Sequence, residues 1–105
     1  MEGLKKFILY LGLNDKDTKT QKINTIEAYK ICNNILLSYT EGATIFEANG
    51  IYKHQDGTFT IEKTLRIELL FTNKDTVIKI INDLKKVFNQ ESVAVQEENI
   101  TSELM

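Results

Sequence analysis

Residues 43–71, ATIFEANGIYKHQDGTFTIEKTLRIELLF, decide the fold of this chain. Apolar and polar residues alternate through both halves of the stretch, as they do in β-strands that bury one face. Asp56-Gly57 lies between the halves and is a strong signal for a tight turn, because Gly accepts the positive φ that such a turn requires. The stretch therefore predicts two antiparallel strands joined as a hairpin.

The register of this hairpin follows from the length of the turn. If the Asp-Gly dipeptide alone forms the turn, residues whose numbers add to about 113 face each other. Phe46 then faces Ile67, and Glu47 faces Arg66, which is a favourable opposite-charge pair. A longer loop through residues 54–55 is the alternative.

The two-residue turn would divide the hairpin into an apolar and a mixed face. The apolar face carries Phe46, Ala48, Gly50, Tyr52, Phe59, Ile61, Leu65, Ile67, Leu69 and Phe71, with Lys63 as its exception. The mixed face carries Ile45, Glu47, Asn49, Ile51, Thr60, Glu62, Thr64, Arg66 and Glu68. A sheet of this kind is covered by helices on one side only.

The segments before the hairpin predict a strand and a helix. Residues 5–13 are rich in Phe, Ile, Leu and Tyr on both faces, which favours a central strand. Residues 14–22 are polar and predict a loop. A helix capped by Asn24 or Thr25 follows. Its apolar face is formed by Ile26, Tyr29, Cys32, Leu36 and Tyr39.

The segments after the hairpin repeat this order. A second helix begins near Asn73 and ends at Asn89, a residue that tolerates the left-handed conformation. Its core positions are Val77, Ile81, Leu84 and Phe88. Residues 92–96 alternate as a final strand, and residues 97–105 form an acidic tail.

The order strand, helix, strand, strand, helix, strand predicts an α+β, ferredoxin-like βαββαβ fold. Right-handed crossovers place the strands of a four-stranded antiparallel sheet in the order 4-1-3-2, with two helices on one face. No linker divides the chain, so we expect one domain over residues 1–105. The ordered core is expected over about residues 4–97, followed by the tail at 98–105.

Composition excludes several classes of function. The chain has 105 residues, with 13 Lys and Arg against 15 Asp and Glu, and so gives no reason to expect a nucleic-acid or membrane partner. One Cys and one His exclude an intrachain disulfide and a His/Cys zinc site within one chain. We therefore expect no metal and no cofactor. No apolar segment has the length of a signal peptide or membrane span, so a cytoplasmic location is the default.

Few side chains could carry chemistry. His54 is expected in an exposed turn and Cys32 in the core, so they do not form a nucleophile and base. Glu62 and Glu68 are six residues apart on one strand, or roughly 20 Å, which is too far for a carboxylate pair. Asp15 is expected in a hydrated loop. The mixed face lacks aromatic residues in this register, which argues against RNA binding.

Assembly is the role that the mixed face favours. It is too apolar to be purely solvated and too charged to be a core, so we expect it to form a homo-oligomer, a dimer or a trimer. The expected interface residues are Ile45, Glu47, Asn49, Ile51, Arg66 and Glu68.

From Gly42 to Val95 the chain resembles a family of small uncharacterised bacterial and mobile-element proteins. The shared features are Gly50-Ile51-Tyr52, Asp56-Gly57, Glu62 and the string Phe88-Asn89-Gln90-Glu91-Ser92-Val93. The topology also resembles that of the trimeric PII and CutA proteins.

The Gln90-Glu91-Ser92 run has two interpretations. The structural one is that its side chains cap the end of the second helix and the start of the last strand. The functional one is a ligand site at this junction. Its expected residues are Tyr10, Tyr52, Glu62, Gln90, Glu91 and Ser92.

Three hypotheses of function follow. The first is a non-enzymatic homo-oligomeric module, PII/CutA-like in architecture, that binds a small molecule or a protein partner between subunits. The second is a small dimeric α+β enzyme that uses Glu62 or Glu91 as a general base beside Tyr52. The third is a phage or plasmid accessory protein of the anti-defence type that occludes a basic host protein through its acidic surface.

Overall fold

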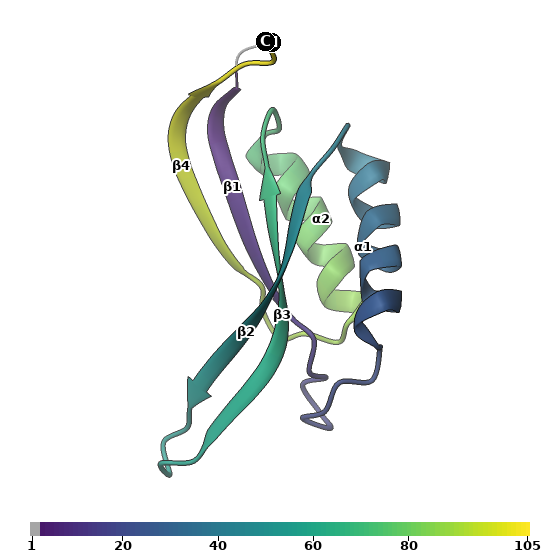
Figure 1. Cartoon of the computed structure of the whole chain (residues 1–105), viewed down its shortest axis with the longest axis vertical. Coiled ribbons are helices and arrows are strands. Elements are labelled where there is room, and N and C mark those ends of the chain that lie inside the picture. Colours follow the sequence, from purple (N-terminus) through teal and green to yellow (C-terminus); the bar gives the residue numbers. More distant parts are fainter. Residues whose placement is uncertain (1–2) are drawn as a thin grey trace.

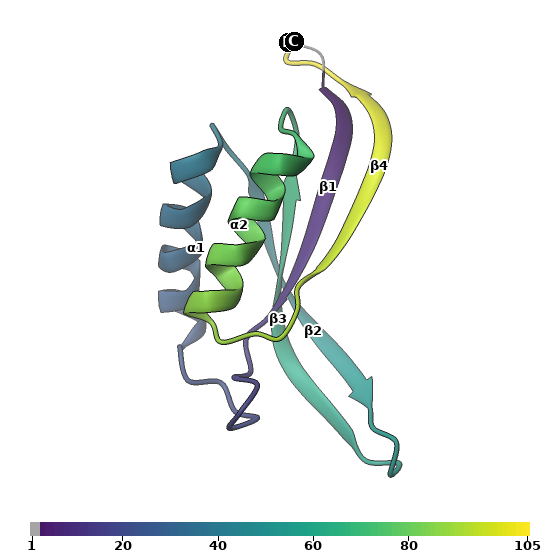
Figure 2. The same cartoon turned by 180° about the vertical axis from the view of Figure 1, so that it is seen from behind.

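The computed structural model describes residues 3–105 and contains six elements (Figure 1). They are β1 (Gly3–Gly12), α1 (Thr25–Tyr39), β2 (Thr44–Lys53), β3 (Phe59–Leu69), α2 (Lys74–Val87) and β4 (Ala94–Ser102). The strands form one antiparallel sheet in the order β2-β3-β1-β4, and both helices cover the same face (Figures 1 and 2). The predicted ferredoxin-like fold and strand order are confirmed.

Local signals set the helix ends. The Asn24 side chain accepts a hydrogen bond from the Glu27 N–H at 2.9 Å and caps α1. Asn73 caps α2 in the same way, through the Thr76 N–H at 2.9 Å. After α2, Asn89 adopts a positive φ of 49°, as its position in the sequence predicts.

The buried face of α1 differs from the predicted one. Ala28, Cys32 and Leu36 are buried, whereas Ile26 is 73% exposed. A residue step turns a helix by about 100°, so Ile26 points almost opposite to Ala28. Tyr39, at the other end of the predicted stripe, is also exposed. The buried residues of α1 are spaced four apart. The sequence does not show this clearly, because the first of them, Ala28, is too small to stand out as a core residue.

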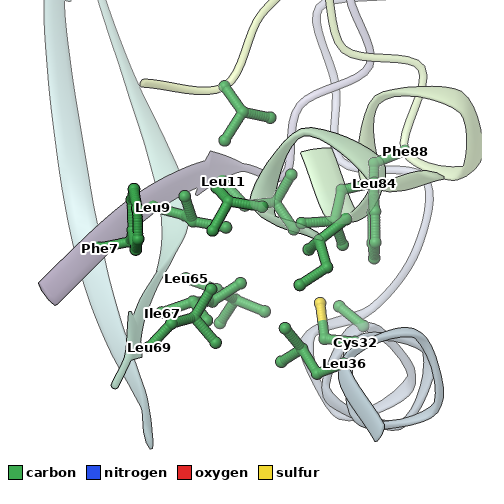
Figure 3. Close-up of a cluster of buried hydrophobic side chains, with 14 of the residues drawn as sticks. Phe7, Leu9, Leu11, Cys32, Leu36, Leu65, Ile67, Leu69, Leu84 and Phe88 are labelled. Atoms are coloured by element: carbon green, nitrogen blue, oxygen red, sulfur yellow. The ribbon is translucent and has the colours of Figure 1, made fainter. Parts of the chain in front are cut away.

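The core lies between the helices and the covered face of the sheet (Figure 3). β1 contributes Phe7, Leu9 and Leu11, the residue directly after it is the core residue Leu13, and β3 contributes Leu65, Ile67 and Leu69. Each helix adds a short row of apolar side chains, including Cys32 from α1. Burial raises the pKa of the Cys32 thiol to about 12, which makes this residue a structural one, as predicted.

The hairpin between β2 and β3 closes with the longer of the two predicted loops. The His54 N–H donates to the Thr58 carbonyl at 2.8 Å, and Lys53 with Phe59 is the last strand pair. Gly57 has a φ of 89°, as expected for the turn. Because the loop 54–58 has an odd number of residues, facing residues add to 112, and the predicted register is wrong by one.

This shift moves every β2 side chain to the other face. Phe46, Ala48, Gly50 and Tyr52 lie on the open face, the face without helices, beside the β3 residues predicted for it. The predicted interface residues Ile45, Glu47, Asn49 and Ile51 lie on the helix side instead, and only Arg66 and Glu68 remain on the open face.

The pairing of charges changes with the register. Glu47 pairs with Lys63 at 3.1 Å instead of with Arg66. Arg66 pairs with Glu68 at 3.0 Å, and its guanidinium lies 5.6 Å from the centre of the Phe46 ring. The open face therefore carries the aromatic side chains of Phe46 and Tyr52, and the prediction that it has none is wrong.

β4 is longer than predicted. It pairs with β1 from Tyr10–Ala94 to Gly3–Ser102, so the strand runs five residues beyond the expected end of the core at 97. Residues 98–102 are part of the sheet and not a tail. An ion pair between Lys5 and Glu97 at 2.6 Å joins the two strands.

The far end of the hairpin, residues 51–61, projects beyond the helices and is called the arm below (Figures 1 and 2). The radius of gyration is 14.5 Å, against about 13 Å for a compact domain of this length. Ile51, Phe59 and Ile61 are all more than half exposed on the arm's helix-side face, beyond the reach of the core. Within residues 3–105 neither helix is long and apolar enough to cross a membrane.

Candidate functional site

Tyr52 and Glu62 meet on the open face where the arm joins the sheet. Glu62 faces Gly50 across the β2–β3 ladder, and Tyr52 is two residues further along the same face of β2. A Cβ atom at Gly50 would lie 3.2 Å from the Tyr52 hydroxyl oxygen. The ring therefore folds back over a position that has no side chain. This contact explains why a glycine precedes the tyrosine by two positions in the Gly-Ile-Tyr string.

A second glycine makes room for the Glu62 carboxylate. A Cβ atom at Gly12, at the end of β1, would lie 2.5 Å from Oε1 and 2.9 Å from Oε2 of Glu62. Real Cβ atoms do not approach so closely, so the carboxylate occupies space that any other residue at position 12 would fill. Beside it, the Asn14 N–H donates to Glu62 Oε2 at 2.9 Å.

The pair has a defined electrostatic character. The pKa of Tyr52 is raised, first because the phenol is partly removed from water, and then by the charge of and hydrogen bonding to Glu62. At neutral pH Tyr52 is therefore a neutral hydroxyl that donates. A carboxylate has about four lone-pair sites, so one bond from Asn14 leaves Glu62 with acceptor capacity for a ligand.

Gln90 reaches the same site from the end of α2. Its side-chain amide donates to the carbonyl of Asn14, the residue whose N–H holds Glu62. It also contacts the Phe88 carbonyl at 3.4 Å, so part of the predicted capping role is present. The structure thus brings Tyr52, Glu62 and Gln90 together, with Gln90 acting through Asn14.

The other three predicted ligand-binding residues lie apart from this site. Tyr10 faces Arg66, four residues from Glu62 along β3, or roughly 13 Å at the usual strand rise. Its hydroxyl donates to Gln96 at 3.0 Å. Glu91 and Ser92 are exposed between α2 and β4.

A second polar cluster lies further along the open face. Glu68 accepts from Arg66 and lies 3.7 Å from Lys6, while the Arg66 Nε is buried without a hydrogen-bond partner among the described residues. Ile8, paired with Glu68 across the ladder, is buried although no helix covers this face. The cluster shields apolar surface on a face that has no helix.

Two cavities lie away from this site. One of about 1040 Å³ opens at the opposite end of the sheet, lined by α1's end, the start of β2 and residues 103–104. It contains none of the six predicted ligand-binding residues. A small one of about 100 Å³ lies beside Asp15 and Phe88. Tyr52 is about half exposed in the single chain, so the Tyr52–Glu62 site lies on the surface.

The loop 14–22 is more ordered than a hydrated loop. Asp15 is buried, and its carboxylate accepts from the N–H groups of Asp17 and Thr18 at 2.8 and 3.0 Å. These bonds, and a side-chain bond from Asn89, hold its pKa well below the usual range. His54, by contrast, is exposed at the tip of the arm, as predicted, where its Nε2 lies 2.7 Å from the Thr60 hydroxyl.

Gly12 and Asn14 were missed by sequence analysis. Both act on Glu62 across about fifty positions of sequence, and nothing local marks them. The single available signal was that a long apolar strand ends on a glycine, followed two residues later by a polar amide.

The fold is that of a small α+β protein with a PII/CutA-like topology. Residues 6–103 match the family described as "Protein of unknown function (DUF3574)". The chain belongs to this family, which confirms the resemblance to an uncharacterised family. No curated protein matches the chain.

Solved structures share the fold. A phage SAM lyase in complex with S-methyl-5'-thioadenosine is 22% identical, with a TM-score of 0.69 over 96% of this chain and 85% of that chain. A phage SAM lyase in its apo state is 20% identical, with a TM-score of 0.67 over 96% of this chain and 86% of that chain. The divalent ion tolerance protein CutA1 from Ehrlichia chaffeensis is 19% identical, with a TM-score of 0.54 over 96% and 86%.

Proposed function

We propose that this chain is a homo-oligomeric small-molecule-binding protein whose site is centred on Tyr52 and Glu62. The proposal rests on one observation: the side chains of Tyr52 and Glu62 both occupy space that is free only because two neighbouring residues are glycines. Gly50 admits the Tyr52 ring and Gly12 admits the Glu62 carboxylate, while the Asn14 N–H fixes one carboxylate oxygen. A tyrosine and a carboxylate held side by side on a sheet face without helices form a recognition surface.

The chemistry of the pair favours an organic cation. A carboxylate attracts a positive charge directly, and an aromatic ring attracts it through its π face. The similar lyase acts on S-adenosylmethionine and holds S-methyl-5'-thioadenosine in one structure, according to its description. We take an adenosine linked to a sulfonium or thioether as the ligand class for this chain.

A second copy is part of the proposal, because the site of one copy is half open. Tyr52 is 48% exposed, and the adjoining arm presents Ile51, Phe59 and Ile61 to solvent. A two-stranded ribbon is only marginally stable by itself, so a neighbour that covers the arm would stabilise it. Tyr52 lies on the open face of the arm and these three residues on its helix-side face, so we place the neighbour around both faces, where a pocket between subunits would include the site.

Catalysis is the second candidate function, and the contact between Tyr52 and Glu62 favours it. Tyr52 is protonated at neutral pH, as any phenol with a pKa at or above about 10 is, so it would orient the Glu62 carboxylate by hydrogen bonding and Glu62 would be the general base. As a base, Glu62 would take a proton from the carbon next to the one that carries the sulfonium. A C=C bond would form, the C–S bond would break, and the neutral thioether would leave without needing an acid.

Titration calorimetry with S-adenosylmethionine and with S-methyl-5'-thioadenosine tests the first proposal. Glu62→Gln keeps the shape of the side chain and removes its charge. We expect it to weaken binding of the sulfonium by about tenfold or more, in line with a charge-assisted contact, and to affect the neutral thioether much less. Glu47→Gln is the matched control, because Glu47 lies on the other face of the same hairpin, paired with Lys63.

Failure of the wild-type chain to bind either compound would contradict the proposed ligand class. Mass spectrometry of the same mixtures separates the two candidates. Release of S-methyl-5'-thioadenosine that is lost in both Tyr52→Phe and Glu62→Gln supports the enzyme, whereas binding with intact S-adenosylmethionine supports the binding module.

A further inference from the structure

We propose that Gln90, in the Phe88–Val93 string, is a positioning residue that holds the Glu62 carboxylate in place through Asn14. The string was singled out by sequence analysis, and its capping role explains only part of it. The rest of its contacts point to the Tyr52–Glu62 site.

The end of α2 aims Gln90 at the loop. Asn89 takes a left-handed φ of 49°, and the Gln90 N–H then donates to the Lys85 carbonyl at 2.9 Å. This backbone bond fixes Gln90 directly after the helix. From there its side-chain Nε2 donates to the Asn14 carbonyl, 76 positions earlier in the chain.

Asn14 is held from two sides. Its carbonyl accepts from Gln90, and its N–H donates to Glu62 Oε2 at 2.9 Å. The preceding residue, Leu13, donates its N–H to the Lys63 carbonyl at 3.0 Å, which continues the β1–β3 pairing as far as Glu62's neighbour. Asn14 is therefore a link between the end of α2 and the carboxylate.

Asn89 reinforces the same link. Its side-chain amide donates to Asp15 at 3.0 Å and to Asp17 at 2.9 Å, and its carbonyl accepts from the Lys16 N–H at 3.1 Å. The turn that follows α2 thus holds residues 14–17 as one unit. Gln90 adds a side-chain bond to the Asn14 carbonyl, in the peptide group directly after the one whose N–H bonds Glu62.

The consequence reaches Tyr52. Glu62 lies on an open surface, where its long side chain has several rotamers, and the Asn14 N–H selects the one that occupies the Gly12 space beside the phenol. Loss of that bond frees the carboxylate to turn toward water. Gln90 would then influence a ligand that it does not touch. This last step rests on the proposed function.

The ionisation of Tyr52 tests the positioning role without any ligand. The variants are Gln90→Leu, which has no donor, and Gln90→Glu, which has the same shape and cannot donate when charged. Ultraviolet titration near the tyrosinate absorbance, with Tyr52→Phe subtracted, isolates this residue from the other tyrosines. We expect both variants to move the Tyr52 midpoint back toward the ordinary value of about 10, with sulfonium affinity about tenfold weaker.

Glu41→Gln is the control, since Glu41 is an exposed glutamate between α1 and β2, away from the Tyr52–Glu62 site, and it should change neither reading. An unchanged Tyr52 midpoint in folded Gln90 variants would overturn the proposal. If neither variant folds, hydrogen exchange of the Gln90 side-chain amide is measured in the wild type. Slow exchange supports the hydrogen bond to Asn14, and exchange at the rate of a free amide overturns the proposal. A shifted midpoint in a chain that binds no sulfonium would sink the proposed function and leave the positioning role standing.

Discussion

Adding a single carbon atom at Gly12 tests whether the position of the Glu62 carboxylate matters to the site. In Gly12→Ala the new Cβ meets the end of the Glu62 side chain, which is free to move, and not the backbone. We expect the free energy of unfolding to change by less than about 1 kcal/mol, because the entropy that alanine removes from the unfolded chain offsets the crowding. Calorimetry should show sulfonium affinity about tenfold weaker, because the carboxylate is displaced from Tyr52.

Gly42→Ala is the matched control, since no atom lies within 4 Å of a Cβ at that position. It should bind as the wild type does. If Gly12→Ala also binds normally, the position of the carboxylate does not matter to the ligand, and the site has been placed wrongly.

Single residues were predictable where the signal was local. Two helix caps, Asn24 and Asn73, accept hydrogen bonds from N–H groups three residues away, and Asn89 itself adopts the positive φ that ends α2. These roles could be predicted from the neighbouring residues in the sequence. The contacts of Asn14 and Gly12 with Glu62 span some fifty positions. Such contacts depend on which strands pair and in which register, and single-sequence patterns do not contain that information.

The hairpin illustrates the same limit for elements. Both strands were predicted, and so was the turn, yet a loop of five residues instead of two reversed the faces of β2. In the wrong register each pair still looked favourable, since Phe46 against Ile67 is as reasonable as Phe46 stacked on Arg66. Register is strongly specified only where one face is buried, and on the arm neither face is.

The loop 14–22 gives a prediction about pH. Hydrogen bonds to Asp15 lower its pKa in the folded chain, so the folded state favours the charged form. The stabilisation is therefore complete above the ordinary aspartate value of about 3.9 and is lost as the pH falls below it. Asp15→Asn removes this dependence. In urea unfolding, we expect the variant to be less stable than the wild type at pH 7, with the difference shrinking below about pH 4.

Glu41→Gln, at an exposed glutamate, serves as the control for loss of one carboxylate. A constant difference between the wild type and Asp15→Asn from pH 7 to pH 3 would mean that Asp15 contributes by shape alone. The pH-dependent part of the loop's stability would then have another source.

At the scale of the whole molecule, strand order was predictable because handedness and short connections leave few alternatives. The projection of the arm was not, because it depends on where the helices end relative to the strands. The arm makes the chain longer than a compact domain, with extents of 47 × 26 × 22 Å. Its exposed apolar side chains are the strongest reason to expect a second copy.

Ile51→Asp tests that expectation. Ile51 is 70% exposed in one chain, so the substitution should alter monomer stability by no more than about 0.5 kcal/mol. In an assembly that covers the arm, it would bury an unpaired charge and release the subunits. Light scattering after size exclusion should show the wild type well above 12.1 kDa and the variant near it, with sulfonium affinity reduced in parallel. Ile78→Asp, at an exposed site on α2, should leave the mass unchanged. A wild-type mass of one chain at high concentration would refute the assembly and, with it, a site completed by a neighbour.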